Sequence, residues 1–173
     1  KTDIAILLNI TPDHLDRYHY DFQEYADSKF RIIRNQTADD VFIFWGDDPM
    51  IKKGIEKFKP KAALYPFSEN RKPGIKGYVE NGKIILETLK GIYTMDRDLL
   101  SLKGTHNLHN SLASGIAAKV SAIRDEKICT SLSDFCGVEP RLEMVARVKG
   151  VDYINASKAT NVNSCCYGLQ SVN

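Results

Sequence analysis

The feature that most constrains the fold is an uninterrupted apolar run, Ile4–Leu8, which stops at a polar segment containing Pro12. A run of this length and β-branched content is typical of a strand buried on both faces of a parallel sheet. Because proline cannot donate a ladder hydrogen bond, the chain must turn at the carboxyl end of this strand. Open α/β sheets bind ligands at that edge. The sequence therefore predicts a parallel α/β sheet with a candidate site directly after the strand.

The segment Asn9–Tyr18 carries side chains that suit such a site. It contains a hydroxyl, two carboxylates, an imidazole and a guanidinium, on Thr11, Asp13, Asp16, His14 and Arg17. Groups of these kinds can bind a hydrated divalent cation and phosphate oxygens. A solvated, hydrogen-bonded turn uses the same residue types, so the composition of the segment leaves both interpretations open.

The next range, Asp21–Arg34, is predicted to be an amphipathic helix. Its apolar arc consists of Phe22, Tyr25, Ala26, Ile32 and Ile33. Lys29 falls near the middle of this arc. Its ammonium group must reach solvent, pair with a carboxylate or lose its charge, because an unpaired buried ammonium is expensive. Desolvation lowers a lysine pKa, and a neutral amine can react, for example with carbon dioxide.

Further strands and helices follow in alternation. A strand at Val41–Trp45, a helix at Met50–Phe58 and a strand at Ala62–Phe67 continue the β-α-β pattern of a parallel sheet. An Asn81-Gly82 turn between alternating runs then predicts a hairpin, and residues 91–102 are expected to add another antiparallel strand. We expect a small antiparallel sheet appended to the parallel one.

A helix is predicted at His106–Ile123, and its two faces differ in kind. The core stripe consists of Leu108, Leu112, Ile116 and Val120, and the opposite, polar side of Asn107, Asn110, Ser111 and Ser114. The amides of Asn107 and Asn110 can hydrogen-bond a ligand, or they can belong to an exposed or capped helix start. His106 and His109 lack a third ligand at suitable spacing, which argues against zinc.

The last part of the chain contains a second polar segment. After a surface helix at Asp125–Phe135, the range Arg141–Asn155 is predicted to form two strands around a Lys149-Gly150 turn. A polar loop, Asn155–Asn161, then runs into a helix. Its residues Ser157, Lys158 and Thr160 make a candidate anion site at the helix N-terminus, or a capping loop with a solvated lysine.

Composition excludes several classes of protein. The chain has 173 residues, 43% hydrophobic and 27% charged, with a formal charge of +2, which is ordinary for a globular protein and does not indicate nucleic-acid binding. We find no signal peptide and no apolar run of membrane-spanning length. The four cysteines lack metal-ligand spacing, so we expect reduced thiols in a cytoplasmic protein. The chain starts at Lys1 and ends inside a predicted helix, so we expect a piece of a longer protein.

Several separate motifs occur in the order found in the Mur ligases, the ATP-dependent enzymes of peptidoglycan synthesis, which this sequence resembles. They are Asn9–Tyr18, Tyr25–Lys29, Gly104–Asn110, Arg141–Glu143 and Asn155–Asn161. The first and last are most similar to the branch that joins D-glutamate to UDP-N-acetylmuramoyl-L-alanine. The resemblance implies a partial central ATP-binding domain over residues 1–138. Residues 139–173 would begin a Rossmann-like C-terminal domain.

The resemblance also implies a reaction and roles for individual residues. ATP would phosphorylate the substrate carboxylate, and the amine of D-glutamate would displace phosphate from the acyl phosphate. His14 and Lys29 would be the catalytic residues and Mg²⁺ ligands, with Lys29 carbamylated. The nucleotide would be bound through Asn107, Asn110, Arg141 and Lys158. Substrate would contact Thr11, Ser157 and Thr160.

Some family features are missing from this chain. It contains no phosphate-binding loop of the Gly-x-x-Gly-Lys-Thr/Ser type. Pro140 stands where the family has His, Ala156 where it has Asp, and Gly46 where it has Asn. One interpretation is the central part of a D-glutamate-adding ligase that is inactive without the rest of its parent chain. The alternative is a non-catalytic remnant or interaction domain that retains the fold.

Overall fold

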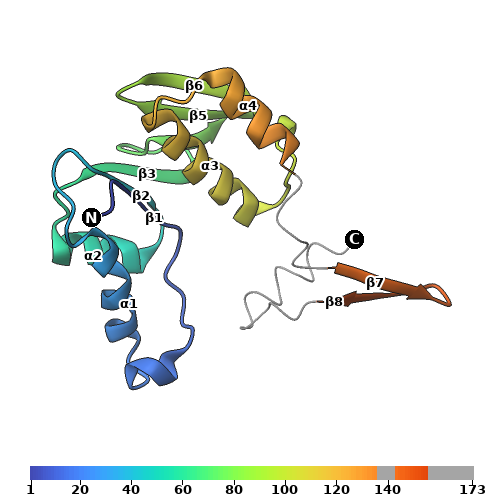
Figure 1. Ribbon diagram of the computed structural model, residues 1–173, viewed down its shortest axis with the longest axis horizontal. Helices are drawn as coiled ribbons and strands as arrows, with labels where there is room; N and C mark the ends of the chain where they lie inside the picture. The colour runs from blue at the N-terminus through green and yellow to red at the C-terminus, as the bar shows by residue number, and fades with distance from the viewer. Residues whose placement is uncertain (136–142, 156–173) are drawn as a thin grey trace. The chain divides into compact units, whose positions relative to one another are not determined.

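One six-stranded sheet organises the first part of the molecule (Figure 1). The computed structural model describes residues 1–135 and 143–155, and the chain divides into two units, 1–135 and 136–173. The sheet contains, in spatial as well as chain order, β1 (Ile4–Leu7), β2 (Val41–Trp45), β3 (Ala63–Asn70), β4 (Gly77–Glu80), β5 (Lys83–Thr88) and β6 (Gly91–Asp96). The first four strands run parallel, and β5 and β6 are antiparallel to their neighbours. The predicted α/β fold class is confirmed.

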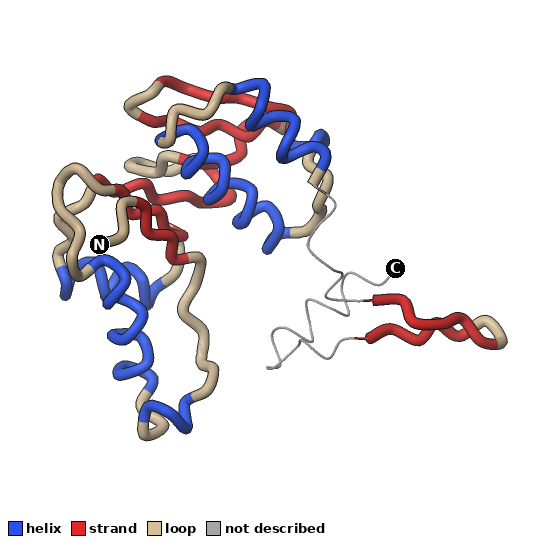
Figure 2. Tube along the Cα trace, in the orientation of Figure 1, coloured by secondary structure: helices blue, strands red, loops and turns tan. Residues whose placement is uncertain are grey.

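Helices cover both faces of this sheet (Figure 2). One face is covered by α1 (Phe22–Phe30) and α2 (Pro49–Phe58), and the other by α3 (Thr105–Val120) and α4 (Asp125–Asp134). Short 3₁₀ turns are η1 (Leu15–Tyr18), η2 (Arg31–Ile33) and η3 (Arg97–Leu99). None of the helices in the described residues is long and apolar enough to cross a membrane.

Two hydrophobic clusters lie on either side of β2. Phe42 and Phe44 pack with α1 and α2, whereas Ile43 packs with α3. The predicted α3 stripe is confirmed, with Leu108, Leu112 and Ile116 at most 2% exposed. Because successive strand residues point to opposite faces, a strand covered on both sides must be apolar throughout, as β2 is.

The predicted antiparallel appendage is present and is continuous with the parallel sheet. Asn81 and Gly82 both have positive φ, 50° and 74°, as a two-residue type I′ turn requires. β4 joins the hairpin to the rest because it pairs in parallel with β3. At Gly77 a Cβ would lie 2.8 Å from Ile116 Cδ1, so glycine allows α3 to pack closely on β4.

The first helix is shorter than the sequence predicts. Asp21 caps it by accepting hydrogen bonds from the backbone N–H groups of Gln23 and Glu24, at 2.7 and 3.2 Å. After Phe30 the chain tightens into η2, which changes the direction in which later side chains point. Ile32, predicted on the apolar arc, is therefore 40% exposed, and Phe30 is buried instead.

The second unit contains a hairpin of β7 (Glu143–Val148) and β8 (Val151–Asn155). Its turn is the predicted Lys149-Gly150, at φ 51° and 81°. An ion pair of 2.9 Å between Arg147 Nε and Asp152 Oδ1 joins the strands. Residues 136–142 and 156–173 lie outside the described part of the chain.

We predict that Gly54→Ala destabilises the fold. A Cβ at this α2 position would collide with the ring of Phe30, which is 3% exposed and packs against both Phe42 and Phe58. Overpacking of this kind costs about 1–3 kcal/mol, more than the roughly 1 kcal/mol that alanine gains in helix propensity. Urea unfolding should show a lower free energy of unfolding, with the exposed Lys53→Ala as control. A more stable Gly54→Ala variant would contradict this packing.

Candidate functional site at the carboxyl edge of the sheet

The segment after β1 presents its polar side chains to solvent and packs its apolar ones inward. Ile10 is buried, and Leu15 and Tyr18 pack against the α1 cluster. His14 adopts a left-handed backbone conformation, φ 49° and ψ 38°, and its side chain is 54% exposed. Its Nε2 lies 3.7 Å from Asp13 Oδ1. Thr11 is half-buried in the same segment.

The carboxylate of Asp48 holds this segment beside the end of β2. Its Oδ2 accepts a 3.0 Å hydrogen bond from the Ile10 backbone N–H. Its Oδ1 accepts from the N–H groups of Met50 and Ile51, at 2.8 and 2.9 Å, and so caps α2. Asp48 is only 3% exposed. One buried side chain therefore fixes both the loop after β1 and the helix after β2.

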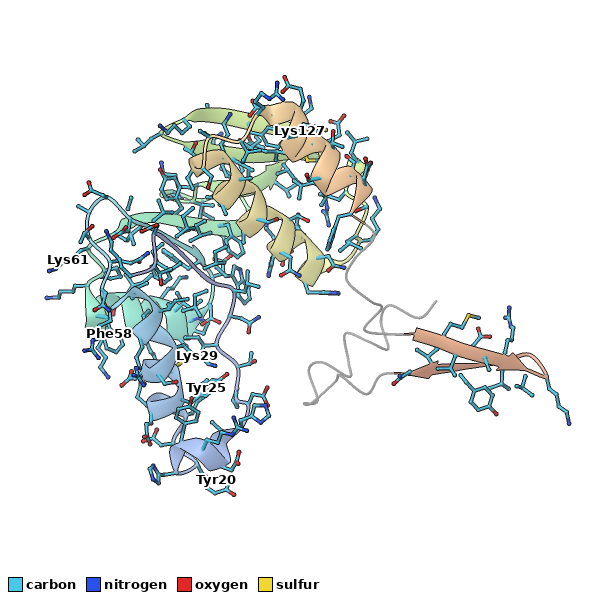
Figure 3. The ribbon with its side chains drawn as sticks, viewed as in Figure 1. Tyr20, Tyr25, Lys29, Phe58, Lys61 and Lys127 are labelled. Atoms are coloured by element: carbon cyan, nitrogen blue, oxygen red, sulfur yellow. The ribbon has the colours of Figure 1, made fainter. Side chains whose placement is uncertain are left out.

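Lys29 is exposed, which corrects its predicted place in the apolar arc. Its Nζ lies 4.6 Å from the centroid of the Tyr25 ring, one helical turn earlier. This is a cation–π contact, and of the alternatives left open by the sequence, the ammonium group reaches solvent. Figure 3 shows Lys29 and Tyr25 on the side of α1 toward the segment that follows β1.

Tyr25 connects Lys29 with the motif around His14. The Tyr18 ring in η1 meets the Tyr25 ring edge to face, with centroids 5.2 Å apart. One aromatic side chain, 8% exposed, therefore contacts both η1 and Lys29. The sequence places Tyr25 in the apolar arc and in the Tyr25–Lys29 motif, but it predicts neither of these contacts.

Three further polar side chains at this edge, those of Asp47, Ser68 and Lys72, were not singled out by sequence reasoning. Asp47 Oδ1 accepts a 2.6 Å hydrogen bond from Lys72 Nζ, and its Oδ2 accepts one of 2.5 Å from Ser68 Oγ. Burial alone would raise the pKa of Asp47, but the hydrogen bonds from Lys72 and Ser68 outweigh it and hold the pKa below its ordinary value. Ser68 belongs to β3 and Lys72 to the loop after it, and no motif spacing indicated that they would contact Asp47.

Gly46, one of the departures from the family pattern, has a packing explanation. A Cβ there would lie 2.6 Å from Ile75 Cδ1 and 3.2 Å from Pro66 Cβ. The backbone N–H of Gly46 donates to the Phe67 carbonyl at 2.7 Å. A larger residue would require the Ile75 side chain to move.

The start of α3 brings a partly buried histidine to the same edge. The His109 ring packs against the Trp45 and Phe67 rings, with centroids 4.7 and 5.8 Å away, and its Nε2 lies 3.2 Å from Glu69 Oε1. Burial lowers the pKa of His109, and Glu69 opposes this shift. A zinc interpretation has no support among the described residues.

The predicted nucleotide-binding amides differ in their surroundings. Asn107 Nδ2 donates a 2.7 Å hydrogen bond to the Lys103 carbonyl, and Asn110 is exposed, although no side chain caps the start of α3. Ser111, predicted on the polar side, is buried. The other predicted site residues, Arg141, Ser157, Lys158 and Thr160, lie outside the described residues, as do Pro140 and Ala156.

The described residues do not by themselves form a metal site, since no three histidine, cysteine or acidic side chains gather to hold an ion. Mg²⁺ is usually bound through one or two protein ligands, with water and substrate phosphates completing the octahedron. If His14 and Lys29 bind Mg²⁺ as the sequence predicts, they would supply only part of its coordination shell.

Comparison with known proteins defines the class. Residues 1–118 match the family model for the Mur ligase middle domain, and the chain therefore belongs to the Mur ligase family. It is 54% identical over 172 residues to a protein of Bacteroides fragilis and 55% identical over 173 residues to one of Bacteroides thetaiotaomicron. Both relatives are named UDP-N-acetylmuramoylalanine–D-glutamate ligase. Each comparison covers 99% of this chain but 38% of the relative, so the chain spans less than half of their length.

Solved structures support the fold. MurF from Acinetobacter baumannii aligns with a TM-score of 0.73 at 20% identity, over 99% of this chain and 38% of that one. A pseudomurein peptide ligase type C from Methanothermus fervidus aligns with a TM-score of 0.60 at 21% identity, over 94% of this chain and 40% of that one. At these identities the likeness concerns the fold alone.

We predict that His109 makes stability depend on pH. Its folded-state pKa lies below the ordinary 6.5, so the unfolded chain binds the proton more readily and stability falls as the pH drops through about 6.5. His109→Gln should flatten this part of the profile, measured by urea unfolding between about pH 5 and 7.5. Glu69→Gln should steepen it, because the carboxylate that opposes the shift is removed. An unchanged slope in His109→Gln would contradict the burial of a neutral imidazole.

Proposed function

We propose that this chain is part of an ATP-dependent ligase that joins D-glutamate to UDP-N-acetylmuramoyl-L-alanine. The observation that carries the proposal is the similarity of 54–55% identity along 99% of the chain to relatives of that name. In domain terms, residues 1–138 would belong to the central domain and residues 139–173 would begin the C-terminal domain.

The proposed reaction activates the substrate carboxylate as an acyl phosphate. ATP transfers its γ-phosphoryl group to a carboxylate oxygen, and the neutral amine of D-glutamate then attacks the acyl carbon. The C–N bond forms as inorganic phosphate leaves, and the amine loses a proton. The protein must hold the reactants in line and neutralise the charge on the transferring phosphoryl group. Cationic side chains and the candidate metal ligands at the carboxyl edge of the sheet would suit this task.

Lys29 has a specific part in this proposal. Its exposed Nζ, in the neutral form, can add to carbon dioxide, forming an N–C bond and releasing a proton. The product is a carbamate, which replaces a cation with an anion carrying two oxygens, the ligand type that Mg²⁺ prefers. Modification would also end the cation–π contact with Tyr25. His14, exposed in the segment that packs on the same tyrosine through Tyr18, would supply a nitrogen ligand.

The other residues of the proposal bind nucleotide and substrate. Bound Mg²⁺ would supply positive charge at the phosphates. Asn110 is exposed and free to meet adenine, whereas Asn107 would have to share or exchange its hydrogen bond to the Lys103 carbonyl. We assign ATP phosphates and ribose to Arg141 and Lys158, and substrate contacts to Thr11, Ser157 and Thr160, on the resemblance of their motifs.

We predict that the isolated 173-residue chain neither hydrolyses ATP nor forms the amide. It contains no Gly-x-x-Gly-Lys-Thr/Ser loop, and so lacks the backbone amides and lysine that hold the β- and γ-phosphates. Phosphate release and incorporation of labelled D-glutamate should both equal the background without protein. Turnover by the purified chain would show that the missing loop is dispensable.

In the complete enzyme that contains this chain, we predict that Lys29→Arg abolishes most ligation. Arginine keeps the cation over Tyr25 but cannot form a carbamate. Loss of an outer-shell partner of a metal ligand already costs about 10–100-fold, so loss of the ligand should cost at least about 100-fold. The measurement is incorporation of labelled D-glutamate into UDP-N-acetylmuramoyl-L-alanine.

The controls separate the role of Lys29 from the ligase assignment. Lys127→Arg, on an exposed part of α4, should leave the rate unchanged. Lys29→Ala should recover partly with added formate or acetate, whose oxygens can replace those of the carbamate. Full activity of Lys29→Arg would refute the carbamate, whereas absence of ligation in the unaltered complete protein would refute the ligase and favour a non-catalytic remnant.

A further inference from the structure

A second surface feature lies away from the carboxyl edge. A groove of about 250 Å³ runs between the C-terminal ends of α1 and η2 and the connection from α2 to β3. These segments directly precede β2 and β3, so the groove lies at the amino edge of the parallel strands. It is therefore distinct from the site built on His14 and Lys29.

The floor of the groove is apolar. Phe30, Ile33, Phe58 and Pro60 line it, and Phe58 is 40% exposed despite its size. The Phe58 ring is stacked on that of the buried Phe30, with centroids 5.1 Å apart and an angle of 21° between the ring planes. One face of an aromatic ring is thus held in place while part of it remains in contact with water.

The rim of the groove is cationic. Arg31, Arg34, Lys59 and Lys61 are exposed, and within the described residues their side chains make no ion pair or hydrogen bond. Asp27 is the acidic residue among the described residues that line the groove. Its carboxylate already accepts hydrogen bonds from Lys57 Nζ at 2.5 Å and Gln23 Nε2 at 2.8 Å. Cations near helix C-termini also interact favourably with the helix dipole, but this interaction does not explain why an aromatic ring is exposed beside them.

One buried side chain that lines the groove, Gln36, has a hydrogen-bond acceptor that is unsatisfied within the described part of the chain. Gln36 lines the groove and is 4% exposed, and its Nε2 donates to the carbonyls of Thr2 and Val41 at 3.1 and 2.9 Å. Its Oε1 has no hydrogen-bond partner among the described residues. A buried acceptor left unpaired in this way is unfavourable, and an N–H donor is the group that it lacks.

We propose that this groove binds a short acidic peptide segment of a partner protein. An apolar side chain of the segment would cover Phe58, and carboxylates on both sides of it would meet the unpaired cations of the rim. Opposite charges favour such a complex and accelerate encounter. A phosphate or another small anion would satisfy the cations but leave the ring exposed, so the combination favours a peptide. The small area involved suits a weak, transient complex.

The test is peptide binding to the 173-residue chain, followed by fluorescence anisotropy at low salt. The probes are two labelled pentapeptides with two acidic residues on each side of a central phenylalanine or a central alanine. The phenylalanine peptide should bind, and the alanine peptide should bind at least about fivefold more weakly. Added salt should weaken both, because the rim charges are exposed.

A matched pair of variants locates the binding. Lys61→Glu should weaken binding of the phenylalanine peptide at least about fivefold. Lys127→Glu makes the same charge reversal on α4, and Lys127 lies far from Lys61 in Figure 3. It should change the affinity less than about twofold. Both residues are exposed, and circular dichroism should show that both variants remain folded.

Four results would overturn the proposal. These are no binding up to about 1 mM peptide, equal binding of the two peptides, equal weakening by the two variants, and self-association of the chain that Lys61→Glu abolishes. Equal binding of the peptides would indicate a simple anion site, and self-association would indicate a second copy as the occupant. The readout is independent of catalysis, so this proposal does not depend on the proposed ligase function.

Discussion

Burial of β2 on both of its faces is the constraint on which the rest of the structure depends. Phe42 and Phe44 point to the layer of α1 and α2, and Ile43 points to the layer of α3. Removing these side chains from water on both sides holds the helical layers against one sheet. The carboxyl end of β2 is fixed as a consequence, and the candidate site is arranged around it.

Polar groups at that edge are held by specific partners. Asp48 joins the loop after β1 to the start of α2, Asp47 accepts from Lys72 and Ser68, and His109 meets Glu69. Each of these contacts links segments that are distant in sequence or follow different strands. Groups held in this way need little reorganisation when a charged ligand arrives, which would suit the electrostatic task of the proposed phosphoryl transfer. His14 and Lys29, by contrast, remain exposed.

Most of the fold was predictable because its signals are local. The range of β2 and the turns at Asn81-Gly82 and Lys149-Gly150 agree with the sequence analysis, since apolar runs and positive-φ turn residues act over a few positions. The end of α1 was not predictable, because a helical wheel assumes constant geometry and the chain changes to a 3₁₀ turn after Phe30. That change exposes Ile32 and buries Phe30. The exposure of Lys29 likewise depends on packing, because its Nζ lies over the Tyr25 ring, whose place beside Tyr18 is a tertiary contact.

The sequence by itself determined the fold class, the family and the identity of the motif residues, because these depend on residue types and their order along the chain. Only the tertiary structure decided that Tyr25 contacts both η1 and Lys29, that Asn107 bonds to Lys103, and that Gly46 faces Ile75. It also revealed the groove beside Phe58, whose cations come from two separate connections. The physical reason is that hydrogen bonds, ion pairs and ring contacts act over a few ångströms. Folding decides which distant residues come within that range.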